Sequence, residues 1–357
     1  MQNLVIALNT LDDEQKPFIV LYSDPALFEP FRKITGYPYL MHSAEYEPAF
    51  TSLDRLVNRV SQKLLKKPLI DKRKFVLDVL FPVFDTGYEP NGKPANLHWI
   101  PDFQEHYLPE FFSKEEIERR IAVQKTVSAR DGALLLLSSQ AAFADYKKIY
   151  PEALTRNFVV PFVVSHPGYQ DRDIDAIRRK YSIPEKYYIS SNQFWAHKNH
   201  RVIIEAVKML KDEGVEACVI FTGKQNDWRN PAYFGELEAM VAQFGLGDRI
   251  LFLGLIDRLD QLQLMKHAEA VIQPSRFEGW STVIEDAKAM DQLVIASAIP
   301  VHKEQLRQNG FFFEPLDGAQ LAGIMKGIAR NRPKVMPNNY QEKVKAFAGQ
   351  FLTILES

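Results

Sequence analysis

The residues of this chain that could carry chemistry gather in one short stretch. Glu278 precedes a polar turn, and a helix carrying Glu285 is expected directly after it. The backbone N–H groups that this helix start leaves unpaired belong to Ser281, Thr282 and Val283. Such N–H groups and the helix dipole favour a phosphate or diphosphate, whereas carboxylates beside them suit sugar hydroxyls. The stretch therefore predicts a nucleotide-sugar cradle, although the two acids could also be a solvated turn residue and a first-turn acid favoured by the helix dipole.

A second group of polar residues spans 190–200, between an expected strand and an expected helix. Lys198 lies at the start of that helix, where an ammonium group can neutralise a diphosphate as a point charge. The alternative is structural, because Asn199 is a common type of helix cap and Lys198 could be a solvated surface residue. Both interpretations remain open at this point.

The segments 192–200, 278–285, 299–305 and 99–113 together resemble glycosyltransferase family 4, and the resemblance covers about residues 90–315. That family consists of retaining, metal-independent enzymes with the GT-B fold, which has two facing Rossmann-like domains and an interdomain cleft. The resemblance implies a nucleotide-diphosphate sugar as donor, bound by the second domain, and an acceptor bound by the first. It implies no metal and no cofactor besides the donor substrate.

The resemblance also assigns roles to single residues. Lys198 would hold the donor diphosphate, Glu278 would contact the hydroxyls of the transferred sugar, and Glu285 would bind the ribose. The N–H groups at the helix start would cap the phosphates. The remaining expected substrate-binding residues of the second half are Asn192, Gln193 and Gly223.

Three features depart from the family pattern. Glu278 and Glu285 have six residues between them, whereas the family's two glutamates usually have seven. Where many relatives carry an arginine, about five residues before Lys198, this chain has Asn192 and Gln193. The family's opening strand and glycine-rich loop have no counterpart, since residues 1–11 have the apolar spacing of a helix.

In the first half, Asp102 and His106 follow an expected strand end and could line the cleft. Asp102 could orient the acceptor hydroxyl, and His106 is a weaker candidate. Asp102 could equally cap a turn after Pro101. The acidic pair Asp171 and Asp173 superficially resembles a metal site, but capping of the following helix explains it.

Alternating short apolar strands and amphipathic helices predict an α/β protein with mostly parallel sheets. We expect an acceptor-side domain over 1–165, a donor domain over 170–335 and a helix over 336–357 that packs back on the first domain. A linker near 165–169 separates the halves. The expected strands are 18–22, 95–100, 133–138, 158–164, 187–191, 217–222, 250–253, 270–273 and 293–297. The expected helices are 54–65, 114–129, 141–149, 174–180, 200–212, 233–244, 259–267, 283–289 and 340–355, and a turn is expected at 311–315.

Composition limits the function classes. The net charge of -1 over 357 residues argues against nucleic acid as a partner. The single cysteine, Cys218, allows no disulfide within the chain and suits a reducing cytoplasm. The stretch 62–74 is basic with apolar residues interleaved, so it could touch the inner face of a membrane that carries a lipid-linked acceptor. A solvated helix end is the alternative for this stretch.

These observations predict a retaining glycosyltransferase that moves a hexose-like sugar from a nucleotide-diphosphate sugar to a hydroxyl of a saccharide or lipid-linked acceptor. Assembly of a surface polysaccharide or glycolipid is the expected setting. Two alternatives remain: a sugar-nucleotide epimerase of GT-B architecture, and a catalytically impaired nucleotide-binding protein.

Overall fold

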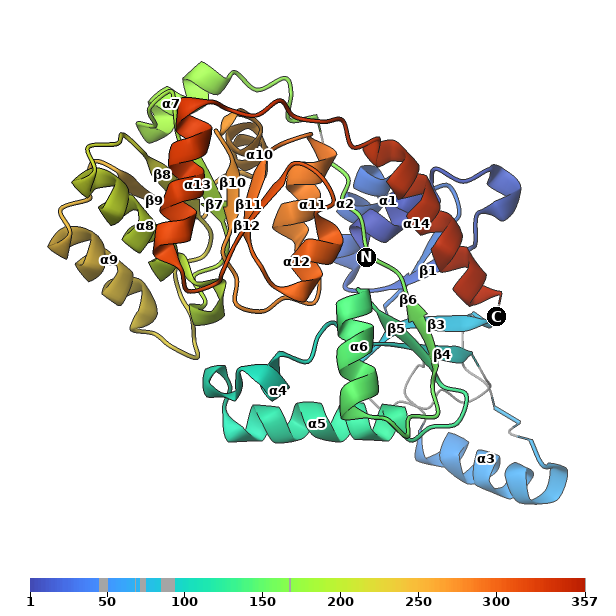
Figure 1. Cartoon of the computed structure of the whole chain (residues 1–357). Helices are drawn as coiled ribbons and strands as arrows, with labels where there is room; N and C mark the ends of the chain where they lie inside the picture. The colour runs from blue at the N-terminus through green and yellow to red at the C-terminus, as the bar shows by residue number, and fades with distance from the viewer. Residues whose placement is uncertain (45–50, 68, 71–74, 85–93, 167, 357) are drawn as a thin grey trace.

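The computed structural model describes residues 1–44, 51–67, 69–70, 75–84, 94–166 and 168–356. Parts of the basic stretch 62–74 and of the linker 165–169 lie outside these described residues. The chain forms two α/β bodies side by side, with the C-terminal helix running from the second body back to the first (Figure 1).

The second body is built on a parallel sheet of six strands in the order β12-β11-β10-β7-β8-β9. Its strands and helices alternate along the chain, so each crossover places a helix on a sheet face. The strands are β7 (Tyr188–Ser191), β8 (Val219–Thr222), β9 (Ile250–Gly254), β10 (Val271–Gln273), β11 (Val294–Ser297) and β12 (Gly310–Phe313). The helices are α7 (Ile174–Tyr181), α8 (His200–Asp212), α9 (Tyr233–Gln243), α10 (Arg258–His267), α11 (Thr282–Ala289), α12 (Pro300–Gln305) and α13 (Gly318–Arg330).

The central strands of this sheet are buried along their whole length. Every residue of β7, β8, β10 and β11 is buried, as expected for parallel strands that are covered by helices on both faces. Because all strands run the same way, their carboxyl ends meet at one edge, where ligands bind in open α/β sheets.

The first body contains a four-stranded parallel sheet, ordered β3-β4-β5-β6, and a separate parallel pair, β1-β2. The strands are β1 (Ile19–Tyr22), β2 (Leu40–Ser43), β3 (Val79–Val83), β4 (Ala95–Trp99), β5 (Leu134–Leu137) and β6 (Arg156–Val159). The helices are α1 (Gln2–Leu8), α2 (Pro25–Thr35), α3 (Ser52–Leu65), α4 (Gln104–Tyr107), α5 (Lys114–Ser128) and α6 (Gln140–Ile149).

The last helix, α14 (Tyr340–Leu355), completes the core of the first body. Its Val344, Phe347 and Phe351 belong to the same buried cluster as Leu4 and Leu8 of α1. In Figure 1 α14 lies along α1, far from the preceding α13. The expected crossing of the C-terminal helix back to the first domain is therefore confirmed.

Several expected elements need correction. The expected turn at 311–315 begins as an edge strand, β12, because the aromatic residues Phe311–Phe313 pair in parallel with β11. The strand expected at 158–164 already ends at Val159. The elements α2, β2, β3, α12 and α13 were not anticipated; in α2 an internal proline, Pro30, masks the helical pattern.

None of the helices in the described ranges is long and apolar enough to cross a membrane.

Candidate active site

Lys198 and Glu278 meet at the carboxyl edge of the second sheet, although 80 residues separate them in the chain. Lys198 Nζ lies 2.6 Å from Glu278 Oε1, and their side chains are 15% and 10% exposed. Lys198 ends a single 3-10 turn after β7, and Glu278 follows β10. The neighbouring strands of the sheet thus bring the two predicted residues together.

Asn199 holds the loop of Lys198 in place. It adopts a left-handed backbone conformation, φ 58°, and makes no side-chain cap on α8. Its side-chain Nδ2 instead donates to the carbonyl oxygens of Pro274 at 3.1 Å and Pro315 at 2.6 Å. The residue that could have been a simple helix cap therefore ties the loop after β7 to the loop after β10.

Three donors converge on one oxygen of Glu278. Besides Lys198, Ser275 Oγ donates to Oε1 at 2.7 Å and Gln273 Nε2 at 2.8 Å. Burial is the largest single influence on the Glu278 carboxyl and would raise its pKa, but the charge and the hydrogen bond of Lys198, together with smaller contributions from neighbouring side chains, lower the pKa overall. No side chain in the described ranges donates to Oε2, which leaves that oxygen to accept hydroxyl groups of a ligand.

The two predicted amides differ in position. Asn192 is buried, and its Nδ2 donates to Gln273 Oε1 at 2.9 Å, so Asn192 orients a donor to Glu278. Gln193 is exposed beside it. Gly223 packs against the same loop, because a Cβ there would lie 2.1 Å from the carbonyl oxygen of Asn192. Its φ of 144° is also one that side-chain-bearing residues rarely adopt.

The start of α11 offers fewer free donors than the sequence suggests. Ser281 Oγ caps Ile284 N, and Ser281 N–H donates to Gln305 Oε1 at 3.2 Å. The predicted phosphate contact of Ser281 N–H therefore meets competition from a glutamine side chain. The N–H groups of Thr282 and Val283 have no acceptor among the described residues, so both can donate to a ligand.

Glu285 does not join Lys198 and Glu278. Its side chain is buried, its Oε1 accepts from Lys288 and from Gln305 Nε2, and its Oε2 accepts from Tyr340 Oη at 2.6 Å. These partners lie on α11, α12 and α14, and they occupy both carboxylate oxygens. The ribose role predicted for Glu285 would require breaking this network.

The neighbouring Asp286 occupies a different position. Its Oδ1 accepts from Arg258 Nη2 at 2.7 Å and lies 2.9 Å from Nε2 of His166. Arg258 opens α10 after the carboxyl end of β9, and β9 is the neighbour of β8, which Gly223 follows. Seven residues separate Glu278 from Asp286, which is the usual family spacing. That spacing was the signal that could have identified Asp286.

Asp102 comes to the site from the first domain. Gly279 touches this loop so closely that a Cβ would lie 2.0 Å from the carbonyl oxygen of Pro101 and 3.0 Å from Asp102 Cβ. Asp102 Oδ1 also accepts from Gln104 N at 3.1 Å, so the predicted turn cap is present as well. Burial raises the pKa of the Asp102 carboxyl, partly offset by that N–H bond. The two domains thus meet next to Glu278.

His106 lies away from this contact. Its Nε2 is 3.1 Å from Gln124 Oε1 of α5, and its ring lies edge-on to Tyr150. The structure therefore places the weaker acceptor-side candidate inside the first domain.

His302, a residue of the segment 299–305 for which the sequence predicts no role, lies two hydrogen bonds from the Glu278 network. Ser297 Oγ donates to the carbonyl oxygen of Ser275, so it must accept from His302 Nδ1, 3.0 Å away. The proton on Nδ1 leaves Nε2 as an acceptor, and this buried atom has no partner among the described residues. Burial lowers the pKa of His302 to about 4, which keeps the ring neutral.

Across the described residues, no group of three or more His, Cys, Asp or Glu side chains is arranged to hold a metal ion. Asp173 caps α7 through Asp175 N at 2.8 Å, and Arg172 lies 3.7 Å from Asp257, so capping and ion pairing account for this acidic segment.

One known protein family matches the second domain of this chain. Residues 173–346 match the family described as Glycosyl transferases group 1. The O-antigen chain mannosyltransferase RfbU of Salmonella typhimurium is 28% identical over 144 residues, 40% of this chain and 38% of that protein. The D-inositol 3-phosphate glycosyltransferase of Jonesia denitrificans is 32% identical over 106 residues, 29% and 24% of the two chains. This chain thus spans less than two fifths of the length of these relatives.

Solved structures match over the whole chain. Anabaena Alr3699/HepE in complex with UDP and glucose superposes with a TM-score of 0.60 at 19% identity, covering 99% of this chain and 93% of that one. WaaG, a glycosyltransferase involved in lipopolysaccharide biosynthesis, gives a TM-score of 0.59 at 14% identity, with 99% and 93% covered. The expected GT-B fold of two Rossmann-like domains is confirmed, and the second domain of this chain matches the group 1 glycosyl transferases.

Proposed function

We propose that this protein is a retaining glycosyltransferase of family 4, which moves a sugar from a nucleotide-diphosphate sugar to a hydroxyl of an acceptor. The observation that carries the proposal is the contact between Lys198 and Glu278 at the carboxyl edge of the donor-side sheet, where the adjacent Gly279 touches the Pro101–Asp102 loop of the other domain. Lys198, a cation suited to bind phosphate, and Glu278, a carboxylate suited to bind sugar hydroxyls, therefore lie side by side.

The donor diphosphate is stabilised by Lys198 and by the N–H groups of Thr282 and Val283. The bond between the anomeric carbon and the phosphate oxygen breaks, and negative charge grows on the leaving diphosphate. Donors that are already in place stabilise that charge without reorganisation. No metal and no further cofactor enters this scheme.

The acceptor oxygen forms its bond to the anomeric carbon on the face that the diphosphate leaves. Its proton passes to an oxygen of the leaving phosphate, so the products are the glycosylated acceptor and a nucleoside diphosphate. Glu278 Oε2 holds hydroxyl groups of the sugar, and Asp102 orients the acceptor hydroxyl. We assign the ribose to Asp286 with Arg258, because both oxygens of Glu285 are already engaged.

The acceptor setting is proposed from the chemistry of the surface and from the relatives. Names of similar proteins refer to O-antigen chains and lipopolysaccharide, which favours a saccharide or lipid-linked acceptor in polysaccharide or glycolipid assembly. We place this reaction in the cytoplasm, at the inner face of the membrane.

The helix α3 supports contact with a membrane. Leu53, Leu56, Val60 and Leu64 follow one another at helical spacing, and they are 69%, 54%, 49% and 76% exposed. Another face of α3 bonds through Asn58 and Ser61 to the backbone of residues 69–70, just after the helix. An exposed apolar stripe on a helix is typical of helices that lie in a membrane interface.

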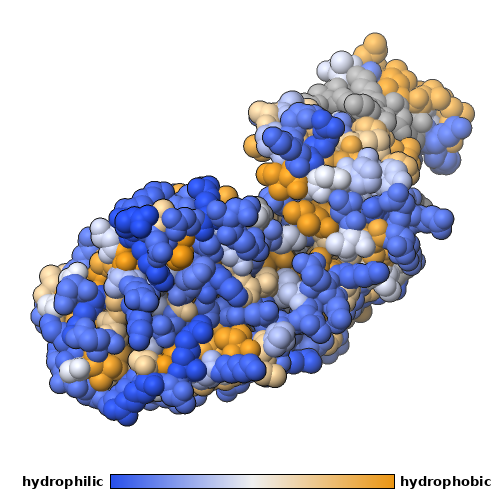
Figure 2. Space-filling model, turned by 90° about the horizontal axis from the view of Figure 1, so that it is seen from above, coloured by the Kyte–Doolittle hydropathy of each residue, from blue (hydrophilic) through white to orange (hydrophobic). Residues whose placement is uncertain are grey.

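Charge along α3 favours an anionic surface. The exposed cations Arg55, Arg59 and Lys63 recur every four residues beside the apolar stripe, and Asp54 is the one acid of this helix. Figure 1 shows α3 standing apart from both sheets, and Figure 2 shows apolar surface at the narrow end of the molecule. Lys and Arg near an anionic membrane each contribute roughly 1 kcal/mol of attraction.

Release of nucleoside diphosphate tests the proposed function. The protein is incubated with a panel of nucleotide sugars, with and without saccharide and lipid-linked acceptors. We expect release that depends on an acceptor and falls about a hundredfold or more in Lys198→Ala, as for loss of one charge-stabilising donor. The matched control, Lys186→Ala, removes an exposed lysine of the same domain and leaves turnover unchanged.

The alternatives give different results in the same experiment. An epimerase converts the donor sugar without any acceptor, and an impaired nucleotide-binding protein binds donor without turnover. Full activity in Lys198→Ala would refute the assigned role of Lys198.

A further inference from the structure

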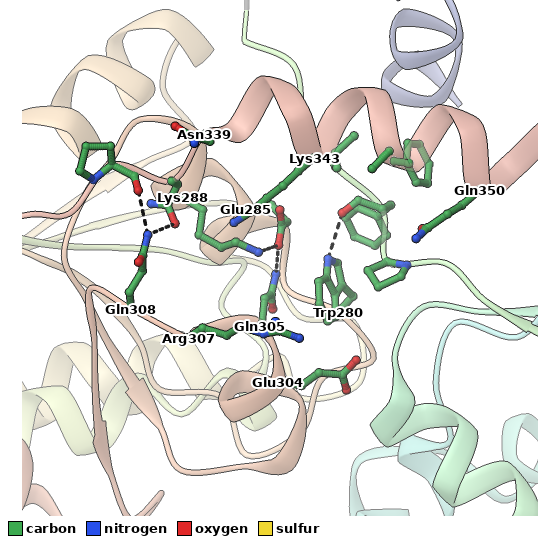
Figure 3. A pocket seen from close by; sticks show the side chains of 17 residues that line it. Trp280, Glu285, Lys288, Glu304, Gln305, Arg307, Gln308, Asn339, Lys343 and Gln350 are labelled. Atoms are coloured by element: carbon green, nitrogen blue, oxygen red, sulfur yellow. Dashed lines mark hydrogen bonds and ion pairs between the residues drawn. The ribbon is translucent and has the colours of Figure 1, made fainter. Parts of the chain in front are cut away.

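A pocket of about 600 Å³ lies where α11, α12 and α14 meet the segment that follows β6. Figure 3 shows Lys288 of α11, Arg307 of the loop after α12 and Lys343 of α14 among the side chains that line it. Its volume is in the range of small-molecule sites, roughly 300–1,000 Å³.

The pocket is separate from the proposed donor site. Ser281, Glu285 and Lys288 recur at helical spacing and lie on the face of α11 that turns toward α12 and α14. Asp286 lies on another face of α11, where it contacts Arg258. One face of α11 therefore borders the proposed donor site and another borders the pocket. Trp280, two residues from Glu278, lines the pocket.

Positive charge accumulates in this pocket. Of its two acids, Glu285 pairs with Lys288, and Glu304 accepts the backbone N–H groups at the start of α6. Neither Arg307 nor Lys343 has an ion-pair partner within the part of the chain that the structure describes.

The cations also affect one another. Partial burial lowers the pKa of Lys343, and the positive charges of Lys288 and Arg307 lower it further, although Glu285 offsets part of this effect. Like charges held close together repel one another, and an anion bound between them relieves this repulsion.

The remaining walls suit a carbohydrate. Trp280 is fixed by a hydrogen bond from Nε1 to the carbonyl oxygen of Phe162 at 3.0 Å, so its indole presents a rigid apolar surface. Gln350 and Asn339 add amide groups that can pair with hydroxyls, and Figure 3 shows the side chain of Gln350 directed toward the pocket. A polar rim around an aromatic side chain is the usual composition of such sites.

We propose that this pocket binds a phosphate group carried on a saccharide, at a site distinct from that of the nucleotide sugar. Arg307 supplies a planar fork for two phosphate oxygens, and Lys343 supplies a point charge. Trp280 and the amides contact the sugar. The ligand is either a free sugar phosphate or the phosphate-linked sugar of a lipid carrier, since both present the same chemistry.

Calorimetric titration of the full chain tests this site. The probes are inorganic phosphate, glucose 6-phosphate, glucose and a short-chain prenyl diphosphate sugar in detergent, each with and without UDP. We expect saturable binding of the phosphorylated sugars that UDP does not abolish. Binding should weaken about tenfold or more in Arg307→Gln and in Lys343→Gln, because each removes a charge-assisted hydrogen bond.

Lys345→Gln is the matched control, because Lys345 is an exposed lysine two positions along the same helix and does not line the pocket. Thermal unfolding of each variant confirms that it is folded. Tighter binding of the free sugar phosphate identifies a soluble ligand, and tighter binding of the prenyl diphosphate sugar identifies a lipid carrier.

Two results overturn the proposal: no saturable binding of any phosphorylated probe, or equal binding by wild type, Arg307→Gln and Lys343→Gln. Neither result bears on Lys198 or on nucleotide release, so failure here is distinguishable from failure of the proposed function.

Discussion

Glu304 of the second domain accepts a hydrogen bond from the backbone N–H of Gln140, at 2.8 Å, at the start of α6 in the first domain. Its other oxygen accepts from Ala141 N at 3.0 Å. The carboxylate therefore lies where the dipole of α6 and its unpaired N–H groups favour negative charge. This contact fastens the two domains together across the cleft.

Removing this contact should loosen the closed arrangement. Glu304→Ala loses an interaction of about 1 kcal/mol between a carboxylate and a helix start, so the domains should separate more often. We expect a larger radius of gyration in small-angle X-ray scattering and slower turnover. Lys303→Ala, a change at the exposed neighbouring residue, is the control, and equal scattering curves for both variants would contradict the prediction.

A side chain at Gly279 should slow sugar transfer while leaving donor binding nearly unchanged. A Cβ in Gly279→Ala would lie 2.0 Å from the carbonyl oxygen of Pro101, so the loop that carries Asp102 has to move. A displacement of about 1 Å at a reacting centre can cost roughly a hundredfold in rate. We expect turnover to fall by about that factor, while nucleotide affinity, measured by titration, changes little.

Gly323→Ala serves as the control for this substitution, because no atom lies within 4 Å of the Cβ position in α13. If Gly279→Ala keeps wild-type turnover, the contact between the Asp102 loop and Glu278's turn has no role in transfer.

The adjacent acids of α11 should differ in their effect on nucleotide binding. Asp286→Asn weakens the pair with Arg258 and the proposed contact with ribose, so the dissociation constant for the nucleoside diphosphate that the wild type releases should rise about tenfold, as for loss of one charged hydrogen bond. Glu285→Gln should leave that constant nearly unchanged and instead lower the melting temperature, because Glu285 links Lys288 and Tyr340 inside the protein. The reverse pattern would restore Glu285 as the ribose residue.

These two acids also show what the sequence could and could not predict. Apolar runs with helical or strand spacing located α8 and α14 at their observed bounds, since those elements bury one continuous face. Lys198 and Glu278 could be paired because each follows a strand, and the carboxyl ends of parallel strands share one edge. Which of Glu285 and Asp286 faces that edge depends on the rotation of α11 against α12 and α14, which spacing along one helix does not reveal.

The first domain was harder to predict for a related reason. The pair β1-β2 lies apart from the four-stranded sheet and both strands are only half-buried; the apolar run of β1 was enough to predict it, whereas Leu40–Ser43 of β2 lacks such a run. Phe311–Phe313 fall in the expected turn 311–315, yet pairing with β11 makes them a strand. In both cases the segment is a strand because it pairs with a strand elsewhere in the chain, which the local sequence pattern does not show.

His302 should make stability depend on pH. Burial lowers its pKa from 6.5 to about 4 in the folded chain, so below pH 6.5 the unfolded chain binds more protons at this residue. Its contribution to stability is therefore fully present above pH 6.5 and is lost as the pH falls toward 4, by up to about 1.4 kcal/mol per pH unit.

Urea unfolding of wild type and His302→Gln at pH 7.5, 6 and 5 measures this effect. We expect the free energy of unfolding to fall less steeply with decreasing pH in His302→Gln than in wild type. His267→Gln, at an exposed position at the end of α10, should keep the wild-type slope. Identical slopes for all three proteins would show that His302 is not held neutral by burial.

The apolar stripe of α3 should control binding to membranes. Leu56→Asp with Val60→Asp removes two exposed apolar side chains and adds negative charge beside Arg59. If these side chains insert into an anionic bilayer, their loss removes about 3 kcal/mol of apolar burial, roughly a hundredfold in partitioning. Co-sedimentation with vesicles of phosphatidylethanolamine and phosphatidylglycerol measures the change, with phosphatidylcholine vesicles as the uncharged comparison. Leu27→Asp on α2 is the control, because Leu27 is also exposed, at 63%, and this variant should bind vesicles like wild type. If the α3 double variant binds as well as wild type, another surface meets the membrane. If added salt does not weaken binding, the cations of α3 have no role in it.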